Sequence, residues 1–298
     1  MIRAATMALA LTVSVGCKAK PPEPAPPAAY CPASKAIQVA TWNLEWLNRR
    51  SDHGIVKRAD EDYRRLGRYA GRLNAEVIAF QEVDGPEAAE RVFDPKEWRI
   101  HTTRQKSPQR AGFAVRRAVP FTANPDVESL DVGGLRTGAD ITVTACGQRL
   151  RLLSVHLKSG CFDDPLDRPN KACSRLRQQL GPLEDWIDAR AREDVPFAVL
   201  GDFNRRFGRT DTFWPEIDDS DPPNADLTDA GAGRTSPCWN AKYPEFIDHI
   251  VLDKRARRWF RPESFDVMTF DPADAPHKRV LSDHCPLKLT LELERGAP

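Results

Sequence analysis

Short apolar runs alternate with longer amphipathic stretches from residue 36 to the end of the chain. In the last run, 286–294, leucine recurs at every second position between polar or charged residues. This period predicts a strand with one buried face. Similar runs predict further strands at 36–43, 76–83, 111–118, 196–204 and 245–253. Residues 139–159 predict a hairpin that turns at Gly147.

Two longer stretches carry apolar residues at helical spacing. Residues 59–74 place one apolar face along a helix, made of Tyr63, Leu66, Tyr69, Ala70 and Leu73. Residues 173–193 do the same with Leu176, Leu180, Leu183 and Ile187. The Gly181-Pro182 pair predicts a kink in this second helix. Strands outnumber helices, and hairpins mix with helical crossovers, so the pattern predicts an α/β or α+β fold with one mixed sheet or two facing sheets.

The first 35 residues have a different character. Residues 1–16 have a positive start and then an apolar stretch, too short to span a bilayer but as long as a signal-peptide core. Ser14-Val15-Gly16-Cys17 resembles the lipobox of bacterial lipoproteins, although Ser14 stands where leucine is usual. An ordinary signal peptide, cleaved a little further on, is the alternative. Six prolines in 18–32 predict an extended tether over 17–35. We therefore expect an exported protein, either periplasmic and anchored through a lipidated Cys17, or secreted.

Composition limits the remaining choices. The chain has 298 residues, of which 41% are hydrophobic, so it can form one large domain or two small ones. A net charge of +1 predicts no strong overall attraction to polyanions, but it leaves room for a local basic patch. Seven cysteines fit an exported protein, and the six other than Cys17 allow fifteen pairings. Cys161 and Cys173 bracket one polar loop and are the simplest pair, whereas zinc binding lacks a Cys-x-x-Cys pair.

Polar side chains stand at the apolar boundaries of six predicted segments. They are Asn43 with Glu45, Glu82, His156, Asp202 with Asn204, Asp248 with His249, and Asp283 with His284. Each alone is compatible with a turn, but ligands bind outside the strand ends of open sheets, so six such segments predict one site. Oxygen donors suit Mg²⁺ or Mn²⁺, and histidine suits acid–base work. The combination predicts hydrolysis of phosphate esters.

Six motifs occur in a characteristic order: TWNLEWL, FQEVD, VHLKS, GDFN, IDHIVL and LSDHCPL. Together they resemble the endonuclease/exonuclease/phosphatase superfamily, whose fold is that of deoxyribonuclease I. The resemblance covers nearly all of the chain after the tether and implies one domain over 36–298. It implies a four-layer α/β/β/α sandwich, in which two facing mixed sheets have helices outside and the site lies between their upper edges.

The resemblance also implies metal ligands. By position, Asn43 and Glu82 correspond to metal-binding residues, and Asp283 to a further ligand. Glu45 stands where many relatives have an acidic residue near the metal, and a structural salt bridge is its alternative. The sequence leaves open whether one or two Mg²⁺ or Mn²⁺ ions bind.

The catalytic roles follow in the same way. Asp202 corresponds to the residue that orients or deprotonates the attacking water, and Asn204 to a donor to the phosphoryl oxygens. His284 corresponds to the catalytic histidine, oriented by Asp248. His156 resembles the second histidine of the deoxyribonuclease and sphingomyelinase branches. Apurinic-site nucleases carry a tyrosine there, so His156 argues against that branch.

The substrate is less well defined. Arg136 and Lys158 are candidate phosphate contacts, with an exposed surface position as the alternative for each. We expect a monomeric metal-dependent phosphodiesterase, with nucleic acid as the favoured substrate. The alternatives are a phosphomonoesterase or a sphingomyelinase-like lipid phosphodiesterase, and, less favoured, an inactive binding module. A nuclease predicts a basic groove, and a lipid enzyme predicts exposed apolar residues at the rim.

Overall fold

The computed structural model describes residues 30–208, 210–223, 225–238 and 242–293. The expected signal peptide and most of the expected tether lie outside these ranges. The described end of the tether is attached to the domain. Tyr30 packs against the central core and its carbonyl accepts the backbone N–H of Cys146 at 2.7 Å. Cys31 forms a disulfide with Cys146.

In the described part of the chain, the strands form two mixed sheets of six strands each. The first sheet has the order β11-β12-β1-β2-β4-β3. Its strands are β1 (Ala36–Leu47), β2 (Val77–Val83), β3 (Trp98–Thr102), β4 (Arg110–Arg116), β11 (Asp266–Val267) and β12 (Leu287–Glu292). The second sheet has the order β5-β6-β7-β8-β10-β9. Its strands are β5 (Phe121–Ala123), β6 (Ala139–Ala145), β7 (Gln148–His156), β8 (Phe197–Asp202), β9 (Thr228–Asp229) and β10 (Asp248–Leu252).

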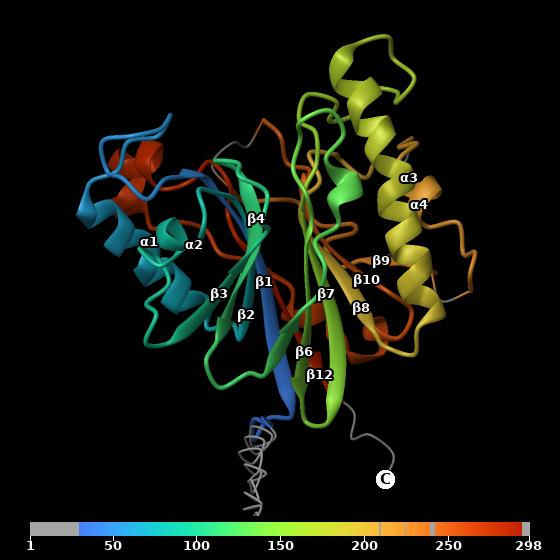
Figure 1. Ribbon diagram of the computed structural model, residues 1–298, viewed down its shortest axis with the longest axis horizontal. Coiled ribbons are helices and arrows are strands. Elements are labelled where there is room, and N and C mark those ends of the chain that lie inside the picture. Colours follow the sequence, from blue (N-terminus) through green and yellow to red (C-terminus); the bar gives the residue numbers. More distant parts are fainter. Residues whose placement is uncertain (1–29, 209, 224, 239–241, 294–298) are drawn as a thin grey trace, which may run out of the picture.

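Helices cover the outer faces of both sheets (Figure 1). The α-helices are α1 (Asp60–Leu73), α2 (Pro86–Ala89), α3 (Lys171–Arg192) and α4 (Trp214–Ile217). Short 3₁₀ helices are η1 (Glu128–Leu130), η2 (Ala256–Trp259), η3 (Pro262–Ser264) and η4 (Pro272–Val280). The first two α-helices pack on the first sheet, and α3 and α4 pack on the second. The predicted four-layer α/β/β/α sandwich is therefore confirmed.

Hydrophobic patterning explains the layers. Residues at alternate positions of β1, such as Ile37 and Val39, point into the central core between the sheets, while Ala40 and Trp42 pack under the helices on the other face. The leucines of β12 also enter the central core. Both faces of β1 are buried, which is why its centre is so apolar, whereas β12 alternates buried leucines with more exposed polar residues.

Side-chain hydrogen bonds mark the starts of the two long helices, and a left-handed residue ends the first. Helix α1 starts where the Asp62 carboxylate accepts the N–H of Ala59 at 2.8 Å, and it ends at Asn74 in the left-handed conformation, φ 51°. Helix α3 starts at Asn170, whose side chain accepts the N–H of Cys173 at 2.8 Å. It continues from Lys171 to Arg192 through Gly181-Pro182 without interruption.

Three disulfides reinforce the sandwich. The predicted pair Cys161–Cys173 is confirmed, and the others are Cys31–Cys146 and Cys238–Cys285. Among the described residues, no helix is both long and apolar enough to cross a membrane.

Candidate active site

The predicted site residues meet where the two sheets approach each other at the carboxyl ends of β1, β2, β7 and β8. The amide nitrogen of Asn43, at the end of β1, donates to Asp202 Oδ2 of the other sheet at 3.0 Å and to Glu82 Oε1 at 3.2 Å. Strands β1 and β2 are parallel, as are β7 and β8, so each pair ends at the same edge. This topology brings together side chains that are 159 residues apart in the sequence.

A bulge in β1 shapes the first half of the site. Glu45 and Trp46 have φ of 42° and 52°, and Glu82 has φ of 60°, which is left-handed backbone that non-glycine residues rarely adopt. The reversed peptides aim N–H groups at the site, because Glu45 N donates to Asn43 Oδ1 at 2.9 Å and Trp46 N donates to Glu82 Oε2 at 3.1 Å. The bulge therefore fixes both predicted ligands through its own backbone.

A glycine allows the second half to form. Gly201, with φ of 148°, lies so close to β7 that a Cβ there would be 2.0 Å from the carbonyl oxygen of Val155. This close approach sets Asp202 opposite His156 in the ladder. Asp202 Oδ1 accepts the backbone N–H of Asn204 at 2.8 Å, and the Asn204 amide donates to the carbonyl of Leu157 at 3.1 Å.

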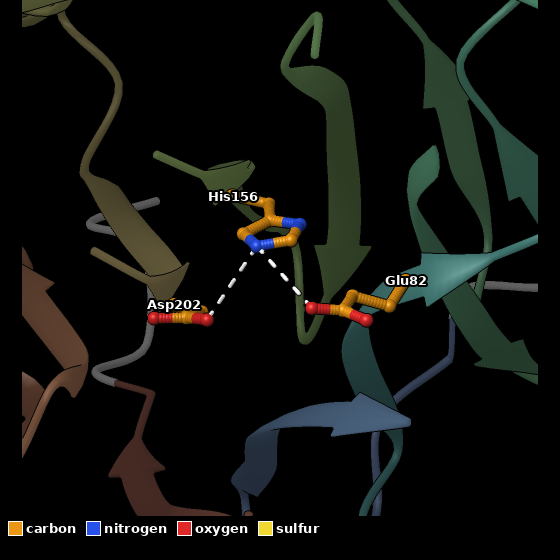
Figure 2. A group of neighbouring side chains, drawn as sticks. All are labelled: Glu82, His156 and Asp202. Carbon is orange, nitrogen blue, oxygen red and sulfur yellow. Dashed lines mark ion pairs between the residues drawn. The ribbon is translucent and has the colours of Figure 1, made fainter. Parts of the chain in front are cut away.

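The His156 imidazole faces two carboxylates, as Figure 2 shows. Its Nε2 lies 3.5 Å from Glu82 Oε1 and 3.6 Å from Asp202 Oδ2. Both distances exceed the usual N–H···O range of about 2.7–3.2 Å, so neither carboxylate locks the ring. Burial lowers the pKa of His156 well below its ordinary value, with a further contribution from Arg136. The ring is therefore a neutral hydrogen-bonding group at neutral pH.

His284 is held by a short hydrogen bond. Its Nδ1 lies 2.6 Å from Asp248 Oδ2, which leaves Nε2 facing Asp202 Oδ2 at 3.9 Å. Burial acts to lower the pKa of His284, but Asp248 outweighs it and the pKa is raised well above the ordinary value. The predicted orientation of His284 by Asp248 thus has a direct structural counterpart.

The neighbouring histidine serves the fold. His249 points to the other face of β10, where its Nδ1 lies 3.3 Å from Asp229 Oδ1 and its Nε2 lies 2.9 Å from the carbonyl of Arg205. Its ring also stacks on Phe207 with centroids 3.8 Å apart. These contacts give His249 a structural role, so of the two neighbours only Asp248 joins the site.

Two of the predicted metal ligands, Glu45 and Asp283, lie next to each other and close to His284. Asp283 N donates to Glu45 Oε2 at 2.9 Å, so the two acidic residues are neighbours. Burial, together with the negative charge of Asp283, raises the pKa of Glu45 to about 7. Burial likewise raises the pKa of Asp202, against the opposing effect of His284. Acidic groups are thus crowded and partly desolvated here, an arrangement that a bound divalent cation would relieve.

The donor set therefore fits a hard cation, with one qualification. Glu82, His156 and Asp202 offer atoms within 4.8 Å of one another, and so do Asp202, Asp248 and His284. Asn43 presents its nitrogen to the carboxylates while its oxygen accepts Glu45 N, so in this arrangement it acts as a hydrogen-bond donor. Its amide would have to rotate to offer oxygen to a metal.

The two predicted substrate contacts differ. The partly buried Arg136 guanidinium donates to the carbonyl of Leu157 at 2.5 Å, the same carbonyl that accepts from Asn204, and so it lies at the site. Lys158 instead bonds through Nζ to the carbonyl of Ser159 at 2.5 Å. Its charge nevertheless acts on His156 and helps to lower the pKa of that ring.

Sequence reasoning missed the polar groups beneath the site. Ser282 Oγ donates to the Asn43 carbonyl at 2.7 Å and accepts His284 N at 3.0 Å, which ties the histidine loop to β1. Gln81 Nε2 donates to Ser154 Oγ at 3.1 Å and links the two sheets. Ser282 stands in LSDHCPL, whose Ser282-Asp283-His284 we call the SDH motif, and Gln81 stands in FQEVD, so both had a signal. Ser154 had none, because a lone polar residue in a strand reads as an exposed position.

A cavity of about 560 Å³ opens beside His284. Its lining includes Asp248, Asp283 and His284 from the site, aromatic rings from Phe162 and Tyr243, and the guanidinium of Arg206. Arg206 lies between those two rings, 5.2 and 5.0 Å from their centroids. The candidate site therefore has space for an organic group next to the histidine.

Comparisons with known proteins agree with this geometry. The model of the Endonuclease/Exonuclease/phosphatase family matches residues 40–284. TDP2 from D. rerio, solved with a single-strand DNA product, has a TM-score of 0.61 and 19% identity, covering 86% of this chain and 98% of that chain. The human Nocturnin catalytic domain has a TM-score of 0.58 and 15% identity, covering 86% and 92%. The 3'-5' exonuclease NExo from Neisseria meningitidis has a TM-score of 0.56 and 17% identity, covering 86% and 100%.

A comparison with curated protein sequences finds no significant match. The structural likenesses, all at low identity, establish the fold. The family match spans most of the chain and contains each strand end that contributes to the site, from Asn43 to His284. The chain therefore belongs to the endonuclease/exonuclease/phosphatase family of phosphoric ester hydrolases.

Proposed function

We propose that this protein is an exported, divalent-metal-dependent phosphodiesterase that acts on nucleic acid. The observation that carries the proposal is the meeting of His156, Asp202 and His284 around one point, beside the Glu82 carboxylate. Three groups that can donate or accept protons thus surround a position where a phosphoryl group would sit next to acidic side chains.

Glu82, Asp283 and Glu45 would hold Mg²⁺ or Mn²⁺, with Asn43 orienting Glu82 through its amide. When bound, the ion supplies positive charge that stabilises the phosphoryl and leaving oxygens. Asp202 belongs to both groups of possible ligands, the one with Glu82 and His156 and the one with Asp248 and His284. This sharing is compatible with one or two ions.

The protein's own side chains supply proton transfer and contacts to the phosphoryl oxygens. Asp202 accepts a proton from the attacking water, because it is buried and its Oδ1 is oriented by Asn204 N. His284 presents its Nε2 to the substrate, since its Nδ1 is hydrogen-bonded to Asp248. His156, Asn204 and Arg136 donate to the non-bridging oxygens, where negative charge develops.

Two observations favour a nucleic acid over a lipid in the membrane. Among the described residues only Ile55 and Tyr243 are large hydrophobic side chains with high exposure, which is a small apolar rim for a lipid enzyme. The tether is also fixed at the opposite end of the domain, at Cys146 near the start of β7. The nine residues of β7, from Gln148 to His156, extend over about 26 Å at about 3.3 Å per step.

The export of the protein is proposed from the apolar stretch and the lipobox-like segment of residues 1–17. If Cys17 is lipidated, the described end of the tether is still held at Cys146, at the opposite end of β7 from His156, which leaves the site open to soluble substrates. Periplasmic attachment and secretion are both compatible with that arrangement. We propose that the protein acts as a monomer, since one chain supplies each side chain of the site.

A substrate panel with Mg²⁺ or Mn²⁺ tests the proposal. It comprises plasmid DNA, single-stranded oligonucleotides, RNA, bis-p-nitrophenyl phosphate, p-nitrophenyl phosphate and sphingomyelin vesicles. We expect cleavage of nucleic acid and of the diester, loss of activity with EDTA, and near-abolition in folded Asp202→Ala and His284→Ala. Activity on the monoester alone would instead indicate a phosphatase, and activity on vesicles alone a lipid enzyme.

A further inference from the structure

Arg58 is a charged side chain buried between the bulge of β1 and the start of α1, with 1% of its surface exposed. Its guanidinium lies within hydrogen-bond distance of five backbone carbonyl oxygens, and three of these contacts share the two hydrogens of Nη2. The acceptors are Leu44 at 3.1 Å, Glu45 at 2.8 Å, Trp46 at 3.3 Å, Val280 at 2.8 Å and Leu281 at 2.7 Å. Because all of these acceptors are backbone carbonyls, Arg58 holds the surrounding backbone in place.

The five carbonyls belong to two segments that both enter the site. Leu44, Glu45 and Trp46 form the left-handed bulge. The N–H groups of Glu45 and Trp46 face the site and hold Asn43 and Glu82, while the carbonyls of the same residues face Arg58 behind them. The guanidinium therefore stabilises the backbone conformation that aims those two N–H groups.

The second segment leads into the SDH motif. Val280 and Leu281 immediately precede Ser282, which bonds to the carbonyl of Asn43 and to His284 N. One rigid cation thus spans the backbone of the acidic half of the site and the backbone that carries His284.

We propose that Arg58 is a positioning residue that sets the acidic ligands and His284 in register with each other. The inference rests on the proposed function, because it concerns the same site. Only a planar guanidinium offers five donors in a fixed fork, whereas lysine offers three donors on a flexible stem. Burial lowers the pKa of Arg58, and the nearby negative charges of Glu45, Asp62 and Asp283 oppose that shift.

Arg65 provides a matched control on α1. Its side chain is 12% exposed and forms ion pairs with Asp62 at 3.1 Å and Asp274 at 2.8 Å. Its substitution removes a nearby, mostly buried arginine without removing a contact to the bulge or to the SDH loop. Arg58→Met, Arg58→Lys and Arg58→Ala are therefore compared with Arg65→Met and Arg65→Ala in the full chain.

The first readout is Mn²⁺ binding measured by electron paramagnetic resonance, which needs no turnover. Loss of a group that orients metal ligands weakens binding by about 10- to 100-fold, and we expect this in Arg58→Met and Arg58→Lys. We expect kcat on bis-p-nitrophenyl phosphate to fall by a similar factor of about 10- to 100-fold with KM little changed. Added guanidinium ion, below denaturing concentrations, should restore part of the activity of Arg58→Ala and none in Arg65→Ala.

The outcomes separate positioning from simple support of the fold. Thermal unfolding identifies which variants are folded, and Arg58→Lys supplies the comparison if Arg58→Met does not fold. Wild-type Mn²⁺ affinity and kcat in a folded Arg58 variant would overturn the inference, as would equal losses in Arg65→Met. A wild-type chain that binds no Mn²⁺ would refute the proposed function and this inference together. Normal wild-type binding and turnover with unchanged Arg58 variants would refute this inference alone.

Discussion

The bond between Asp248 and His284 should contribute to turnover as well as to stability. We consider Asp248→Asn, which keeps the size of the side chain and an oxygen that can accept from Nδ1, but removes the negative charge. The hydrogen bond is short, 2.6 Å, and both side chains are only 12–13% exposed. A hydrogen bond to a charged partner contributes about 1.5–3 kcal/mol. If His284 carries its positive charge in the transition state, losing that amount lowers kcat by about 10- to 150-fold.

The assay is hydrolysis of bis-p-nitrophenyl phosphate at saturating Mn²⁺, with kcat and KM measured separately. We expect kcat to fall while KM and the affinity for the ion held by Glu82, Asp283 and Glu45 stay near wild type, because Asp248 is not one of those three ligands. Asp229→Asn is the matched control, since it disrupts the Asp–His pair on the other face of β10, where Nδ1 and Oδ1 are 3.3 Å apart. Wild-type kcat in Asp248→Asn, or an equal loss in Asp229→Asn, would refute the assigned role of Asp248.

Three further results are expected. Gly201→Ala should lower the free energy of unfolding by at least about 1–3 kcal/mol in urea, because its Cβ meets a backbone carbonyl at 2.0 Å; wild-type stability would contradict the close approach of β7 and β8. Burial lowers the pKa of His249, but Asp229 outweighs it and the net pKa is raised. Wild type should therefore exceed Asp229→Asn most in stability below about pH 6.5, and this excess should shrink as pH rises through the raised pKa; a pH-independent difference in urea melts would contradict this. Replacing both Cys161 and Cys173 by alanine, which opens a loop with a sequence separation of 12, should cost about 3 kcal/mol, and unchanged thermal unfolding would argue against the pairing.

The regular parts of the fold could be predicted because their patterns are local. The alternating leucines of 286–294 became β12, and the apolar face of 59–74 became α1. Short strands such as β3 and β5 were missed, since partly buried positions there give no clear period. Their pairing is decided by β4 and β6 beside them, which is information that a short segment does not contain.

The residues of the site likewise divide into those that the sequence could predict and those that it could not. The side chains named by motif, from Asn43 to His284, come together as expected, because parallel strands end at a common edge. Arg58 could not be found, because an arginine just before an amphipathic helix reads as a solvated residue. Its burial depends on the left-handed bulge in β1. That bulge contains no glycine that would have indicated it in the sequence. The hydrogen-bond direction of Asn43 was equally hidden, since it is set by the backbone N–H of Glu45.

The location of backbone strain argues that chemistry, rather than folding, determined this edge. Among the described residues, eight non-glycine residues have clearly positive φ, and four of them belong to the site, namely Glu45, Trp46, Glu82 and Asn204. Such conformations cost about 1–3 kcal/mol each, and glycine would remove much of that cost. At Glu45, Glu82 and Asn204, however, glycine would remove a side chain that the site uses. The strain therefore persists where surrounding hydrogen bonds offset it, and those bonds come from Arg58, Ser282 and Asp202. A variant that relaxes the bulge should consequently gain backbone freedom and lose the alignment of Glu82.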